Sequence, residues 1–66
     1  MKQFITGTDY YAEGFDVPIT VFKKTDKNLF VYHKHLDATP NVRRVKIRIN
    51  LLGNEFVKIN DAVFLA

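Results

Sequence analysis

Residues 42–52 alternate between apolar and polar side chains, and this period of two restricts the fold more than any other feature of the sequence. Successive side chains of a β-strand point to opposite faces of the sheet, so the pattern predicts a strand that is buried on one face only. The expected inward positions are Val45, Ile47, Ile49 and Leu51. The expected outward positions are Arg44, Lys46, Arg48 and Asn50.

The rest of the chain also consists of short β-rich runs separated by turn-forming residues. The further strands are expected over residues 2–6, 17–24, 28–35, 55–60 and 62–65. Residues 9–14 are expected to form a loop or one short helical turn that stops at Gly14. Residues 37–41, which contain Pro40, form the clearest loop, and turns are expected at Asp26-Lys27 and Asn60-Asp61. This spacing predicts an all-β fold, a small five- or six-stranded antiparallel barrel of the SH3-like or OB-like type.

Only 66 residues and no cysteine are available to stabilise the fold, so residues 1–66 are expected to form a single domain. A domain of this size has a marginal core, and apolar packing must supply its stability. Six Phe and three Tyr provide large apolar area in few residues. A homodimer is one way to add to that core.

The hairpin around Asp26-Lys27 is expected to be apolar on both faces. A two-residue turn sets Phe22 opposite Val31 and Val21 opposite Tyr32. One face then carries Ile19, Val21, Phe30 and Tyr32, and the other carries Phe22, Leu29 and Val31. Such a hairpin is either enclosed in a barrel or uses one face to bind a partner.

The hairpin around Gly53 is expected to have a three-residue loop, because that register sets apolar residues opposite each other. Gly53 or Asn54 would take a left-handed conformation in this loop. Arg48 would then lie opposite Lys58, and Phe56 opposite Asn50. Like charges that face each other across strands are destabilising, so this arrangement would need solvent, a carboxylate or an anionic ligand to offset it.

Positive charge is concentrated in the middle of the chain. Residues 23–48 carry a net charge of +6, whereas residues 1–22 carry −2 and residues 49–66 carry −1. Basic side chains with an aromatic on a small barrel are typical of single-stranded nucleic-acid binders, in which cations follow the phosphates and a ring stacks on a base. The candidate nucleic-acid contacts are Arg44, Lys46, Arg48, Lys58, Phe56, Arg43 and Lys34. The alternative is an ordinary solvated strand face.

Three other features of the sequence are candidate binding sites. His33 and His35 point the same way on a strand, but no Cys or further His completes a metal site, so no metal or cofactor is expected. The acidic, aromatic segment 9–16 either binds an acidic protein partner, together with the spare hairpin face, or plugs the barrel. The apolar C-terminal strand either closes the barrel against the first strand or pairs with a second copy.

No catalytic motif is present. The chain has no Cys, no Ser and no Gly-rich phosphate loop, so it is not expected to be an enzyme. Its longest apolar runs are too short to cross a membrane as a helix, and no secretory pattern or Asn-x-Ser/Thr sequon is found. The expected location is therefore the cytoplasm.

Overall fold

The computed structural model describes residues 1–34 and 41–66, and these residues form seven β-strands in one antiparallel sheet. The strands are β1 (Asp9–Ala12), β2 (Phe15–Lys24), β3 (Asn28–His33), β4 (Arg43–Lys46), β5 (Arg48–Ile49), β6 (Glu55–Ile59) and β7 (Ala62–Leu65). The all-β prediction is confirmed, but the count of five or six strands is wrong. The helical turn expected near residues 9–14 is also wrong, because those residues form β1 and a turn at Glu13-Gly14.

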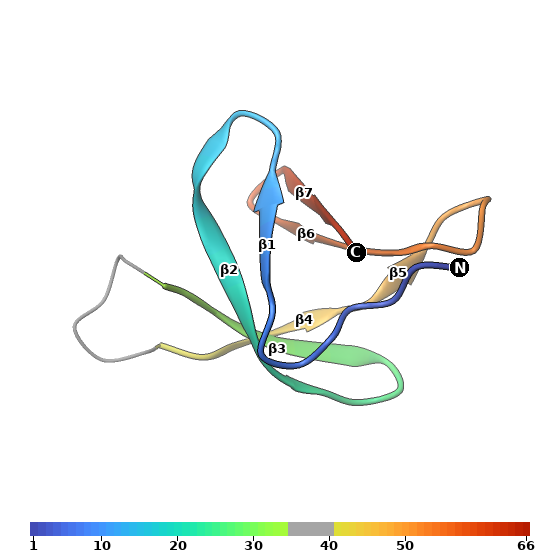
Figure 1. The fold of residues 1–66 in the computed structure, drawn as a ribbon, viewed down its shortest axis with the longest axis horizontal. Coiled ribbons are helices and arrows are strands. Elements are labelled where there is room, and N and C mark those ends of the chain that lie inside the picture. Colours follow the sequence, from blue (N-terminus) through green and yellow to red (C-terminus); the bar gives the residue numbers. More distant parts are fainter. Residues whose placement is uncertain (35–40) are drawn as a thin grey trace.

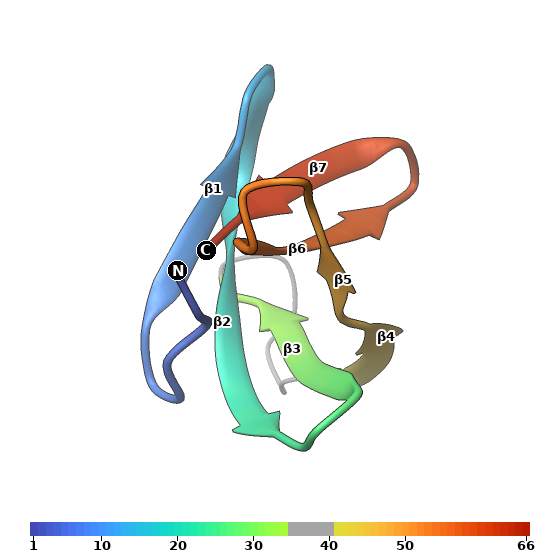
Figure 2. The same ribbon diagram turned by 90° about the vertical axis from the view of Figure 1, so that its right-hand side faces the viewer.

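The sheet curls into a nearly closed barrel (Figure 1). Its strand order is β4-β3-β2-β1-β7-β6-β5, so the C-terminal strand lies between β1 and β6. The closure alternative for this strand is therefore correct, although β1 is not the first strand that was expected. The two ends of the sheet, β4 and β5, are joined by Ile47 alone (Figure 2). The backbone N–H of Ile47 donates to the carbonyl of Lys27 at 2.9 Å, which breaks the predicted strand over residues 42–52 in two.

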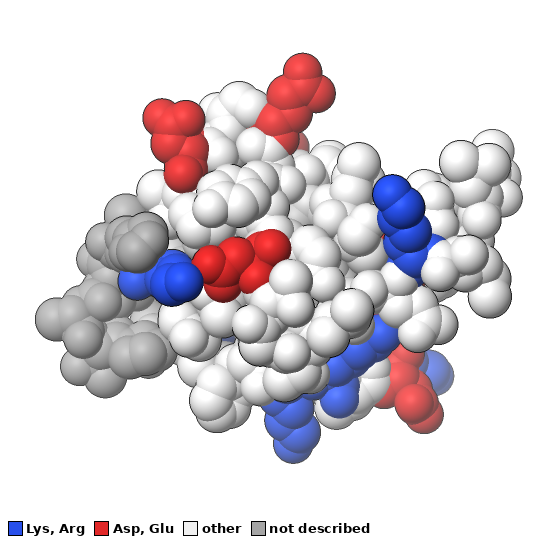
Figure 3. All heavy atoms as spheres, in the orientation of Figure 1, with Lys and Arg blue, Asp and Glu red and all other residues white. Residues whose placement is uncertain are grey.

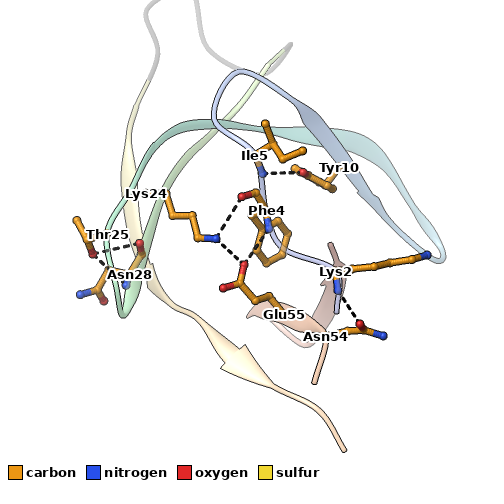
Figure 4. A network of polar contacts seen from close by, with 9 residues as sticks. All are labelled: Lys2, Phe4, Ile5, Tyr10, Lys24, Thr25, Asn28, Asn54 and Glu55. Carbon is orange, nitrogen blue, oxygen red and sulfur yellow. Dashed lines mark hydrogen bonds and ion pairs between the residues drawn. The ribbon is translucent and has the colours of Figure 1, made fainter. Parts of the chain in front are cut away.

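The expected strand over residues 2–6 is absent, and this segment instead crosses one end of the barrel (Figure 4). The carbonyl of Lys2 accepts a hydrogen bond from the N–H of Glu55 on β6, at 2.9 Å. The N–H of Gly7 donates to the carbonyl of Val21 on β2, at 2.8 Å. Between these two attachments, Phe4 is only 2% exposed and plugs the core.

The predicted register of the β2–β3 hairpin holds only next to the turn, because a bulge at Phe22 shifts the rest of the pairing. Next to the turn, Lys24 lies opposite Leu29, as a two-residue turn requires. Beyond the bulge the pairing shifts by one residue, so that Val21 faces Val31 and not Tyr32. The extra residue, Phe22, is 59% exposed. The shift gathers the best-packing side chains of both strands on one face. The inward set is Ile19, Val21, Leu29 and Val31, all at most 1% exposed.

The predicted three-residue loop after β5 is wrong, because the loop spans five residues. Ile49 lies opposite Glu55, and Asn50 to Asn54 connect them. The side chain of Asn50 stabilises this longer loop: its Oδ1 accepts hydrogen bonds from the N–H groups of Leu52 and Asn54, both at 2.9 Å. The expected left-handed residue is Gly53, with φ of 80°.

The remaining turn agrees with the sequence pattern, but the core agrees only in part, because Ile49 and Leu51, expected inward, are 60% and 106% exposed. Asn60 and Asp61 form the β6–β7 turn with φ of 48° and 68°, which is the conformation of a tight hairpin turn. The core is assembled from all parts of the chain: Phe4, Ala12, Ile19, Val21, Leu29, Val31, Ile47, Val57, Ile59 and Phe64. Across the two described ranges, no helix is long and apolar enough to span a membrane.

Candidate nucleic-acid interface

Three cations project from the seam where the sheet closes. Arg44, Lys46 and Arg48 occupy alternate positions along β4 and β5 and are exposed. The residues between them turn inward, since Val45 is half-buried and Ile47 is 8% exposed. Alternate residues of a strand are about 6.6 Å apart, which applies to Arg44 and Lys46 on β4, and Arg48 follows on β5 after the break at Ile47. We call these three residues the basic row.

An aromatic side chain lies beside each end of the basic row. Arg44 is directly opposite Phe30 on β3, and Arg48 is directly opposite Phe56 on β6. Both rings are partly exposed. The Nζ atom of Lys23 lies 5.7 Å from the centroid of the Phe30 ring, so a fourth cation adjoins the Arg44 end. The sequence singled out Phe56 but not Phe30 or Lys23, because their proximity to Arg44 depends on the β2–β3–β4 pairing.

The predicted clash between Arg48 and Lys58 does not occur. Lys58 lies opposite Val63 on β7, whereas Arg48 lies opposite Phe56. The five-residue loop produces this difference, because it shifts β5 by two residues along β6. Cross-strand repulsion therefore gives no reason to expect an anionic ligand. What supports a ligand is the exposure of the row and the aromatic ring beside each end.

Lys34 and Arg43 lie apart from the basic row. The Nζ atom of Lys34 donates to Oδ2 of Asp9 at 3.0 Å, and Asp9 also accepts a hydrogen bond from the Thr20 hydroxyl at 2.7 Å. The hydrogen bond from Lys34 to Asp9, and the attraction of the ammonium to the Asp9 charge, raise the pKa of Lys34 above its ordinary value. Arg43 is exposed, but its register position opposite Val31 belongs to the inward face.

Charge is unevenly distributed over the surface. Figure 3 shows two groups of acidic atoms at the top of the molecule, over the tip of the β1–β2 hairpin, and mostly basic side chains along the lower side, where one acidic group lies among them. The acidic tip carries Glu13 and Asp16. An anionic ligand would thus be attracted toward one side of the barrel and repelled from the opposite end.

A partly buried ion pair that the sequence did not reveal holds the N-terminal segment in place (Figure 4). Oε1 of Glu55 accepts hydrogen bonds from the Lys24 ammonium and from the backbone N–H of Phe4, both at 2.8 Å. The ammonium also donates to the carbonyl of Phe4 at 3.3 Å. The donors and acceptors of this network bond to one another, so we assign the ion pair a structural role and not a role in ligand binding. No sequence signal links Lys24 to Glu55, which are far apart in the chain.

The other candidate surfaces are partly retained. The proposed apolar hairpin face is largely buried in the core, but Phe22 stays exposed. Tyr11 is 63% exposed, whereas Tyr10 packs edge-on against Phe4 with ring centroids 4.8 Å apart. His35 and Asp37 lie outside the described residues. Within the described ranges, no group of three or more metal-ligating side chains is found.

Comparisons with protein-family models, with curated proteins and with solved structures give no match to this chain.

Proposed function

We propose that the protein is a non-enzymatic nucleic-acid-binding module whose basic row contacts phosphates. The observation that supports this most is the placement of Phe30 beside Arg44 and of Phe56 beside Arg48. Cations in a line can follow a phosphate backbone, and a flanking ring can stack on a base. Single-stranded nucleic acid suits this geometry best, because its bases are free to stack.

An SH3-like barrel is part of the proposal. Consecutive strands pair with each other along β1–β4 and again along β5–β7. The OB-fold has Greek-key connections, so this meander order favours the SH3-like alternative. The proposed location is the cytoplasm, and no cofactor enters the proposed activity.

A binding assay at two salt concentrations tests the proposal. Fluorescence anisotropy with labelled single-stranded DNA, duplex DNA and RNA should detect binding at about 50 mM salt and much weaker binding at about 200 mM. Arg48→Ala removes one charge-assisted contact, so we expect its affinity for the single strand to fall about tenfold. The dependence of log affinity on log salt should also become shallower by about 0.7.

The matched control is Lys34→Ala, which removes the same charge from a residue outside the basic row. Its affinity should stay within about twofold of that of the original chain, because Lys34 is engaged by Asp9. Equal losses in Arg48→Ala and Lys34→Ala would mean that only net charge matters, and the assigned contacts would be wrong. No binding at the lower salt concentration would reject the function.

A protein is the second candidate partner, and the exposed Phe22 and Tyr11 side chains support it. Only the net positive charge of the chain favours an acidic one, because Tyr11 itself lies beside Glu13. Aromatic residues are enriched where proteins bind each other tightly. Replacing both by Ala would weaken such a complex and leave oligonucleotide affinity unchanged. A comparison of the original chain with this double variant in both binding assays therefore separates the two candidate functions.

A further inference from the structure

An apolar stripe runs along the outward side of β7, in the middle of the sheet. Val63 is 40% exposed and Leu65 is 59% exposed, whereas Phe64 between them is fully buried. Tyr11 of the adjacent strand β1 is 63% exposed. These three residues line one shallow depression of about 450 Å³, together with Glu13, Asp61 and Ala62. Three large side chains thus meet solvent side by side on the two neighbouring strands β7 and β1.

Opposite charges border the stripe on its two sides. Lys58 of β6 lies directly across from Val63 and is exposed. Glu13, which follows β1 on the other side of β7, is also exposed and lines the same depression. From β6 to β1 across the sheet, the order is therefore the Lys58 cation, the apolar stripe and the Glu13 carboxylate.

We propose that this face binds a second copy of the chain, with the two-fold axis running parallel to β7 between the two copies. A rotation about such an axis exchanges the β6 side with the β1 side. Lys58 of each copy then meets Glu13 of the other, and Val63 and Leu65 pack against the same residues of the partner copy. The pattern is complementary to itself, which a closed dimer requires.

An interface of standard size would bury about 800 Å² of each copy, against a total accessible surface of 4811 Å². The basic row lies beyond β6, outside the stripe, but Phe56, which flanks the row, lies directly opposite Leu65 at the border of the stripe. The dimer is argued from Val63, Leu65 and their flanking charges, and sedimentation without nucleic acid tests it separately from the proposed nucleic-acid binding.

Sedimentation equilibrium over protein concentrations from about 10 μM to about 1 mM tests the dimer. We expect the apparent mass to rise from one chain toward two. Val63→Asp places two like charges beside the axis and should keep the protein monomeric at every concentration. Leu51→Asp, in the fully exposed β5–β6 loop, is the matched control and should dimerise normally. Circular dichroism checks that both variants are folded.

A charge exchange tests the proposed pairing directly. At about 50 mM salt, where screening is weak, Lys58→Glu and Glu13→Lys should each weaken the dimer at least fivefold, because each sets like charges opposite each other. The double variant Lys58→Glu/Glu13→Lys should recover most of the affinity. A monomer at 1 mM, a dimer that Val63→Asp leaves intact, or a double variant as weak as the single variants would each overturn the inference.

Discussion

Replacing Phe64 by Ala is expected to lower the free energy of unfolding by about 3–5 kcal/mol. Phe64 is fully buried, lies opposite Val57 and Ala12, and packs edge-on against Phe15 with ring centroids 6.2 Å apart. A domain of this length is expected to have a total stability of about 3–10 kcal/mol, so the loss is about a third of it or more. Urea unfolding followed by circular dichroism measures the change.

Phe22→Ala is the control for this experiment, since it also truncates a Phe side chain, but one on strand β2. Phe22 is the bulged residue and is 59% exposed, so its removal should change the free energy of unfolding by no more than about 0.5 kcal/mol. If Phe22→Ala proved as destabilising as Phe64→Ala, the bulge would be misplaced. The register without a bulge, which sets Phe22 opposite Val31, would then be preferred.

The second large effect is expected at the partly buried ion pair between Lys24 and Glu55. Glu55→Ala leaves the Lys24 ammonium and the Phe4 N–H without their shared acceptor, so unfolding should become easier by about 3 kcal/mol. Glu55→Gln keeps an oxygen acceptor for both donors, which share Oε1, and removes only the charge, so it should cost less than half as much. The two variants together separate the contribution of the charge from that of the acceptor.

A double-mutant cycle with Lys24→Ala identifies the interaction. Because the two side chains are in direct contact, the loss in the double variant should be smaller than the sum of the single losses by about 1–3 kcal/mol. Strict additivity within about 0.3 kcal/mol would mean that Lys24 and Glu55 do not interact, and the described attachment of the N-terminal segment would be incorrect.

The sequence predicted well where local pattern and burial agree. The alternation around Val45 and Ile47 correctly oriented Arg44, Lys46 and Arg48 outward. Asn60-Asp61 correctly predicted a tight turn, because both residues tolerate a positive φ. In these places one short segment contains all of the information.

The predictions from sequence were wrong where contacts between residues far apart in the chain determine the conformation. The bulge at Phe22 arises because Val21 packs better against Val31 than against Tyr32, and this preference involves two strands and the core between them. Phe4 lies in an extended segment that binds Glu55 and Val21 through its neighbours and forms no strand. The length of the β5–β6 loop depends on two hydrogen bonds to one Asn50 side chain, which compete with any register based on apolar pairing alone.

The most direct test of the proposed function is an NMR titration of the ¹⁵N-labelled protein with a short oligothymidine at about 50 mM salt. We predict that the amide signals that move most belong to residues 44–48 and to Phe30 and Phe56, with little change at Tyr11, Val63 or Lys34. Such a map would place the ligand on the basic row. If no signals moved, or if the changes were confined to β1 and β7, the assignment of this surface to nucleic acid would be wrong.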